Sequence, residues 1–207
     1  MKIGIIGTGN IAQYLLESIN TNKQLDGKIS SVFGRNKEVG AHLEKAYNID
    51  FYTDFKSFMN APMDIVVEAA TIDVAVQYMK DVLENKKDIV LSSIGAFQDA
   101  YFLESMEETA KFHSKHIYLP SGAIGGLDLL QSANASNGLE QVTITTRKSP
   151  VSLGMEQISK EDVLFEGSAR DAIKRFPKNV NVALLLSIAG IGVRWNCILC
   201  NNRSSLR

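Results

Sequence analysis

The chain has 207 residues, with 22 Lys and Arg against 23 Asp and Glu, so its formal net charge is −1. This balance argues against a nucleic-acid partner, which would need an excess of clustered positive charge. Apolar residues make up 45% of the chain, which excludes a disordered chain. No apolar run reaches the roughly 20 residues of a membrane-spanning helix, and no export signal is visible, so we expect a cytoplasmic protein without a membrane partner.

Residues 1–119 alternate short apolar strands with helical patterns. The strands are continuously apolar rather than alternating, which predicts a parallel sheet covered by helices on both faces. The fold class we expect here is α/β, a doubly wound parallel Rossmann sheet. The predicted strands are Lys2–Ile6, Ile29–Phe33, Ile49–Tyr52, Asp64–Ala69, Asp88–Ile94 and Ile117–Leu119, and the helices are Ile11–Ile19, Lys37–Tyr47, a short one after Asp54, Asp73–Asn85 and Asp99–Ser114.

Beyond residue 119 the pattern changes. A helix at Leu127–Ala133 and a β-branched strand at Val142–Thr146 precede a polar loop, a helix at Ala169–Arg175 and an apolar segment from Val182. These predict a smaller, incomplete α+β domain over residues 120–192 that would hold the substrate. Residues 193–207 contain the only tryptophan and both cysteines. This break in composition predicts an atypical tail that does not continue the domain before it.

A glycine pattern, G-x-G-x-x-A, follows the first predicted strand at once and opens a helix (Gly7–Ala12). Gly7 permits the tight turn, and Gly9 lets the backbone approach a pyrophosphate. The amides that begin the helix, at Asn10 and Ile11, then face the phosphate charge. A glycine turn that binds nothing is the alternative, but the strand–loop–helix context favours a dinucleotide site.

The end of the second strand predicts which cofactor binds. Enzymes that prefer NAD usually place Asp or Glu there, bonded to the ribose 2′-hydroxyl. This chain has Gly34-Arg35-Asn36, so Arg35 can pair with a 2′-phosphate and no carboxylate repels it. We therefore expect NADP to bind at least as well as NAD, although a solvated arginine in a turn is the alternative.

Longer strings resemble the L-aspartate dehydrogenase family. The resemblance spans residue 1 to about Gly192 and rests on VVEAA (66–70), VLSSIGA (90–96), PSGAIGGLD (120–128), TTRKSP (145–150), LFEGSAR (164–170) and FPKNVNVA (176–183). It implies a Rossmann domain followed by a homoserine-dehydrogenase-like catalytic domain. It also implies NAD(P)-linked oxidation of L-aspartate to iminoaspartate or oxaloacetate, often for NAD biosynthesis, by a homodimer.

The resemblance also implies cofactor-binding positions. These are Ala123 and Asn181 near the nicotinamide, with Asn179 as the fallback if the alignment is shifted. We also expect Ala70, at the end of the first string, to bind the cofactor. An Asn side chain offers a donor and an acceptor to a carboxamide. For Asn181 a helix cap is an equally good interpretation from the sequence alone.

Several other polar residues are candidates for the site, and three of them also have a structural interpretation. Glu68 either lines the cofactor cleft or is a solvated strand-end acid. Ser93 and Ser121 lie at the ligand side of the predicted sheet, where they can contact a substrate carboxylate. Arg147 and Lys178 either bind a dicarboxylate or lie at the surface.

A catalytic residue cannot be assigned from the sequence. The resemblance implies a proton-transferring histidine after the helix that follows Asn181, but the three histidines are His42, His113 and His116. A frameshift after Gly192 would explain this together with the tail. We expect an NAD(P)-dependent L-aspartate dehydrogenase, with a catalytically impaired dinucleotide-binding remnant as the alternative. A homoserine dehydrogenase or dihydrodipicolinate reductase relative is disfavoured by the later strings.

No metal site is expected. Zinc prefers four ligands, and the pair Cys197 and Cys200 lacks two more nearby. His113 and His116 have no acidic or thiol partner close in the sequence and are expected at a solvated helix end.

Overall fold

A computed structural model describes residues 1–122, 124–148, 163–168, 171–172, 175, 181–191 and 196–201. The chain divides into two compact units, Met1–Pro120 and Ser121–Arg207. Within the described ranges, no helix is long and apolar enough to cross a membrane.

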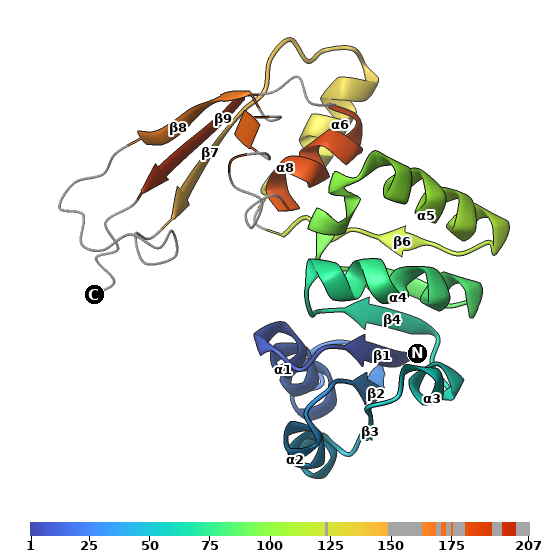
Figure 1. Cartoon of the computed structure of the whole chain (residues 1–207). Helices are drawn as coiled ribbons and strands as arrows, with labels where there is room; N and C mark the ends of the chain where they lie inside the picture. The colour runs from blue at the N-terminus through green and yellow to red at the C-terminus, as the bar shows by residue number, and fades with distance from the viewer. Residues whose placement is uncertain are drawn as a thin grey trace. The chain divides into compact units, whose positions relative to one another are not determined.

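The first unit is built on a six-stranded sheet with the order β3-β2-β1-β4-β5-β6 (Figure 1). Every neighbouring pair is parallel, and Val66 lies opposite Ile89 in the β4–β5 pair. The order reverses at β1, which places the switch point of a doubly wound sheet beside the glycine pattern. The predicted fold class is confirmed. The strands are β1 Lys2–Ile6, β2 Lys28–Phe33, β3 Asp50–Tyr52, β4 Ile65–Glu68, β5 Asp88–Leu91 and β6 Ile117–Tyr118.

Four helices of the first unit, α2 to α5, begin at polar side-chain caps that the sequence supplies. The Asn36 side chain accepts from the N–H groups of Glu38 and Val39. The Asp54 carboxylate accepts from both the N–H and the hydroxyl of Ser57, which lowers the pKa of Asp54. The helices are α1 Asn10–Leu16, which continues as a π-helical turn Glu17–Thr21, α2 Lys37–Tyr47, α3 Phe55–Asn60, α4 Ile72–Glu84 and α5 Ala100–Phe112.

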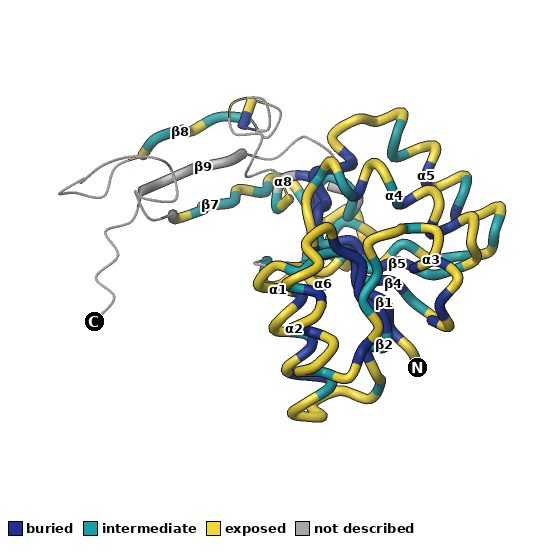
Figure 2. The backbone as a smooth tube through the Cα atoms, turned by 60° about the horizontal axis from the view of Figure 1, so that its bottom comes forward, coloured by how far each residue is buried: buried dark blue, intermediate teal, exposed yellow. Residues whose placement is uncertain are grey.

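Both faces of the sheet are buried, as continuously apolar strands require. On one face Ile3 and Ile5 of β1 belong to a core cluster with Ala12 and Leu16 of α1. On the other face there is no room for a side chain at Gly4, because Met63 and Phe58 occupy that space. Figure 2 shows the central strands as the buried part of this unit, with exposed residues along the outer sides of the helices.

The predicted strand Asp88–Ile94 is wrong at its end. β5 stops at Leu91, and a 3-10 helix begins at Ile94. The chain turns away because the Ser92 N–H donates to the Glu68 carbonyl and the Ser93 N–H donates to the Glu68 carboxylate. An apolar run carries no sign of such a long-range side-chain contact.

The second unit contains a three-stranded sheet with the order β7-β9-β8. β9 runs parallel to β7 and antiparallel to β8. Leu186 of α8 is buried against α6 and β7 residues that include Leu127, Leu130 and Ile144. The elements are α6 Leu127–Ala135, β7 Thr143–Lys148, β8 Val163–Ser168, α8 Asn181–Leu186, which continues as a π-helical turn Ser187–Ile191, and β9 Asn196–Asn201.

Two of these strands were not predicted. Val163–Ser168 has no period-two pattern, since Glu166 and Gly167 interrupt it, and it reads as loop. β9 comes from the segment 193–207 that composition sets apart, yet its backbone pairs on both sides in this sheet. The amino-acid composition of a segment does not show whether its backbone pairs with other strands. Most of the predicted helix Ala169–Arg175 lies outside the described residues.

One packing contact gives a stability test. A Cβ at Gly40 of α2 would collide with the Phe51 ring. We expect Gly40→Ala to destabilise the chain, because overpacking costs about 1–3 kcal/mol. This exceeds the roughly 1 kcal/mol that alanine gains over glycine inside a helix. Urea unfolding measures the change, with exposed Lys45→Ala in the same helix as the control; an unchanged or higher midpoint for Gly40→Ala would contradict the packing argument.

Candidate functional site

The loop after β1 approaches its neighbours so closely that only glycine fits at position 7. Gly7 has a φ of +116°, and a Cβ there would lie 2.5 Å from the Ala69 carbonyl oxygen. Its N–H donates to the Phe33 carbonyl at 2.9 Å. The loop is therefore fixed against the ends of both β2 and β4, the strands on either side of β1.

Gly9 has the opposite surroundings. It is the N-cap of α1, with extended backbone that any residue can adopt, and no side chain caps the helix. No atom lies within 4 Å of the position that a Cβ would take. The start of α1 thus faces open space with its first amides available, which fits the approach of a pyrophosphate.

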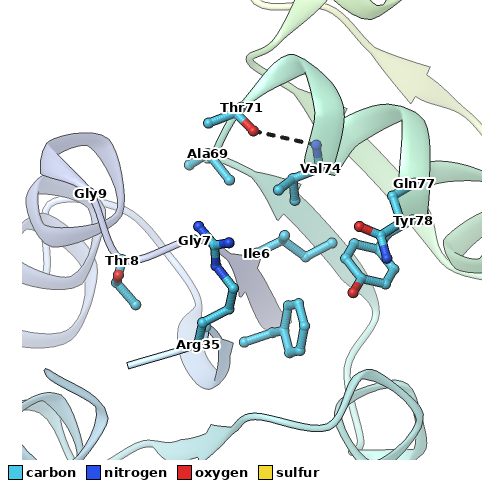
Figure 3. A pocket seen from close by; sticks show the side chains of 13 residues that line it. Ile6, Gly7, Thr8, Gly9, Arg35, Ala69, Thr71, Val74, Gln77 and Tyr78 are labelled. Atoms are coloured by element: carbon cyan, nitrogen blue, oxygen red, sulfur yellow. Dashed lines mark hydrogen bonds between the residues drawn. The ribbon is translucent and has the colours of Figure 1, made fainter. Parts of the chain in front are cut away.

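A cavity of about 320 Å³ opens beside this loop (Figure 3). It brings together four of the residues that the sequence predicted: Gly7, Gly9, Arg35 and Ala70. The complete lining is Ile6, Gly7, Thr8, Gly9, Phe33, Gly34, Arg35, Ala69, Ala70, Thr71, Val74, Gln77 and Tyr78.

Two predicted cofactor residues, Asn10 and Ile11, are not part of this lining. They are the first residues of α1 and are exposed. The Ile11 side chain is 52% exposed, an apolar surface directly next to the glycine loop.

Sequence reasoning missed the wall of the cavity that α4 provides. Thr71 caps this helix by accepting from the Val74 N–H, and Val74, Gln77 and Tyr78 follow on the side that faces the cavity (Figure 3). The available signal was the spacing 71, 74, 78 directly after a strand end, which puts these side chains on one helix face.

Aromatic rings hold this wall in place. The Tyr78 ring stacks on Phe55 with centroids 4.1 Å apart. Phe33 meets both rings edge-on, at 5.2 Å from Phe55 and 5.3 Å from Tyr78. Such offset and edge contacts favour one ring orientation, so the three rings support the Tyr78 side of the cavity.

Gly34 follows β2 at the position where enzymes that prefer NAD usually carry Asp or Glu, and its surroundings are tightly packed. A Cβ at Gly34 would lie 2.8 Å from Thr8 Cγ2 and 3.1 Å from the Phe51 ring. Asp or Glu at this position would require the Thr8 and Phe51 side chains to shift. Arg35 follows and projects into the space between the glycine loop and α4 (Figure 3). It also borders a shallow hollow with Asn36, Lys37 and Glu38.

Glu68 is neither solvated nor a lining residue of the cavity. It is 1% exposed. Its carboxylate accepts from the Ala70 N–H at 2.8 Å, the Ser93 N–H at 2.8 Å and the Ser93 hydroxyl at 2.9 Å. Since the Ser93 hydroxyl proton already points to Glu68, Ser93 does not offer it to a substrate carboxylate.

The remaining predicted residues belong to the second unit. Ala123, Lys178 and Asn179 lie outside the described residues. Asn181 begins α8 and is exposed, and Ser121 and Arg147 are also exposed. The contact of Ala123 and Asn181 with a nicotinamide therefore stays a prediction.

None of the three histidines lines the cavity. His42 lies on α2, and His113 follows α5. The His116 N–H donates to Asp88 Oδ1, and its Nδ1 lies 3.4 Å from the same oxygen. Among the described residues no His, Cys, Asp and Glu cluster could hold a metal ion.

Comparison with known proteins decides the family. The model of the NAD-binding domain of homoserine dehydrogenase matches residues 7–120, and that of the aspartate dehydrogenase C-terminal domain matches residues 128–201. The L-aspartate dehydrogenase of Methanospirillum hungatei is 35% identical over 91% of this chain and 72% of its own length, and that of Methanococcoides burtonii is 37% identical over 93% and 74%. This chain belongs to the L-aspartate dehydrogenase family.

Solved structures are similar to this chain in fold. Aspartate dehydrogenase from Thermotoga maritima matches with a TM-score of 0.76 and 30% identity, over 98% of this chain and 79% of that one. The WlbA dehydrogenase from Chromobacterium violaceum, solved with NADH, shares the fold at a TM-score of 0.58 and 10% identity, over 72% and 44%. The family membership makes the chain an oxidoreductase with an NAD(P)-binding Rossmann domain.

The two glycines of the loop give a matched pair of variants. Gly9→Ala should fold with a loss of only about 1 kcal/mol for a poorer cap, while its methyl group enters the space left for the pyrophosphate. Loss of charge-assisted bonds there should weaken NADPH binding by about 10- to 100-fold. Gly7→Ala should instead lose stability, by about 1–3 kcal/mol from backbone strain alone.

Fluorescence titration with NADPH and urea unfolding separate the two effects. Unchanged NADPH affinity in Gly9→Ala would show that the pyrophosphate does not approach this loop.

Proposed function

We propose that this chain catalyses oxidation of L-aspartate at Cα, giving iminoaspartate and, after hydrolysis, oxaloacetate. The observation that carries the proposal is the open space at Gly9, in a cavity formed by the glycine loop, Arg35 and α4. The family membership of both units supports the substrate. NAD(P)⁺, when bound, supplies the hydride acceptor.

The residues of the cavity bind and orient the cofactor in this proposal. The amides at the start of α1 hold the pyrophosphate, and the close fit at Gly7 keeps them in position. The rigid ring of Tyr78 and the side chain of Val74 close the cavity on the side of α4. From the second unit, the proposal assigns Ala123 and Asn181 to the nicotinamide, and the active form to a homodimer.

For the cofactor we propose NADP, bound at least as well as NAD. Three features support this choice: Arg35 lines the cavity, Gly34 has no carboxylate, and Lys37 lies beside Arg35 at the start of α2. A planar guanidinium matches a phosphate in two hydrogen bonds.

A second candidate function is dinucleotide binding without aspartate turnover. The observation that favours it is the position of the histidines. His42, His113 and His116 all precede residue 120, and none lines the cavity. No residue of the described cavity is a histidine that could move the proton at the amino group.

Arg35→Ala tests the choice of cofactor. The variant should weaken NADP⁺ binding by about 1–3 kcal/mol, the value of a lost charge-assisted bond, and leave NAD⁺ binding unchanged. Calorimetric titration with both cofactors measures this. Lys45→Ala removes an exposed cation from the last turn of α2, away from the cavity lining, and is the control. Equal weakening of both cofactors by Arg35→Ala would refute the assignment.

A steady-state assay separates the two candidate functions. The purified chain is given L-aspartate with NADP⁺ or NAD⁺, and oxaloacetate, ammonia and reduced cofactor in reverse. A positioned general acid/base contributes about 10²- to 10⁴-fold to the rate. Because no histidine lines the described cavity, we expect a turnover number far below about 1 s⁻¹, the lower end of the usual range for enzymes.

Added imidazole should raise that turnover number, because free imidazole can carry the proton that no histidine of the described cavity is placed to carry. Turnover of about 1 s⁻¹ without imidazole would show that another residue moves the proton. A chain that binds cofactor but gives no turnover even with imidazole would favour the second candidate.

A further inference from the structure

Glu68 is a buried carboxylate that neither the cavity lining nor the proposed reaction uses. It is 1% exposed, at the carboxyl end of β4. Its three hydrogen bonds come from N–H and O–H dipoles of Ala70 and Ser93, and no cationic side chain of the described residues forms an ion pair with it. Burying a charge is costly unless donors compensate it, and three donors compensate the Glu68 carboxylate at the edge of the sheet where the cavity lies.

The position of Glu68 along the sheet edge indicates what its charge faces. Ala70, which donates to Glu68 Oε1 at 2.8 Å, also lines the cavity. In the sheet order, Arg35 follows β2 on one side of β1, whereas Glu68 and Ser93 follow β4 and β5 on the other side. A dinucleotide with its pyrophosphate at the β1 loop crosses this edge. With its adenosine phosphate at Arg35, its nicotinamide half lies on the side of Glu68.

We propose that Glu68 sets the preference of the site between the oxidised and reduced cofactor. This inference rests on the proposed dinucleotide binding. The oxidised nicotinamide ring carries a positive charge and the reduced ring is neutral, so a nearby buried carboxylate attracts only the oxidised form. The attraction is stronger in the protein interior than in water. Glu68 thereby favours binding of the oxidised cofactor and release of the reduced one.

Glu68 touches neither substrate nor cofactor in this arrangement and is a positioning residue. It holds the Ala70 backbone at the cavity wall and the turn at Ser93. Loss of these hydrogen bonds alone would weaken both redox forms equally. The ratio of their dissociation constants therefore isolates the effect of the charge from any structural effect.

The experiment compares three variants of the full chain. Glu68→Gln removes the charge at nearly constant size, Glu68→Asp keeps the charge, and Ser93→Ala removes a hydrogen bond without changing charge. Calorimetric titration gives the Kd of NADP⁺ and NADPH, and of NAD⁺ and NADH. We expect the oxidised-to-reduced Kd ratio to rise about three- to tenfold in Glu68→Gln and to stay unchanged in Glu68→Asp and Ser93→Ala.

Thermal melting checks that each variant is folded. If Glu68→Gln does not fold, Glu68→Met neutralises the same position without presenting an amide N–H to the Ser93 N–H, and the same rise is expected. An unchanged ratio in the neutral variant, including equal weakening of both forms, overturns the inference but leaves the proposed function standing. Absence of any cofactor binding by the unsubstituted chain overturns both.

Discussion

The contact between the Gly7 backbone and the Ala69 carbonyl determines how the first unit forms its cavity. A Cβ at position 7 would lie 2.5 Å from that oxygen, and the Gly7 N–H bonds to the Phe33 carbonyl on the other side. The loop is therefore held between β2 and β4 by backbone atoms alone. Because the loop is fixed there, α1 begins in open space at Gly9, and the wall from α4 stands opposite at a set separation. A bulkier residue at position 7 would displace all three features together.

The same packing bears on the proposed choice of cofactor. Gly34 is crowded by the Thr8 side chain of the glycine loop and by the Phe51 ring of β3, so a larger residue at the β2 end requires these two side chains to shift. The absence of a carboxylate at this position is then consistent with its close packing. Arg35, one residue later, is the first side chain free of this constraint, and it reaches the cavity.

The sequence predicted the first sheet well because continuous apolar strands between amphipathic helices have few other solutions. The glycine loop was equally readable, since its spacing has a direct steric cause. The α4 wall was not recognised, because Val74, Gln77 and Tyr78 read as ordinary helix residues until β2 and β4 are placed on either side of β1. β8 and β9 were missed for a related reason: their pairing joins residues far apart in the chain, such as Gly167 with Cys197, and leaves no local period to detect.

Along the carboxyl edge of the first sheet, the charges change from positive after β2 to negative at the end of β4. A guanidinium stands after β2, uncapped helix amides stand after β1, and a buried carboxylate stands between the ends of β4 and β5. An oxidised NADP molecule has the complementary order, with an anionic 2′-phosphate, an anionic pyrophosphate and a cationic ring. Backbone dipoles can serve the centre because the pyrophosphate is the same in both redox states. In the proposed arrangement, a negative charge acts on the end of the ligand whose charge differs between the two redox states, and Glu68 is the buried acidic residue of the described edge at that end.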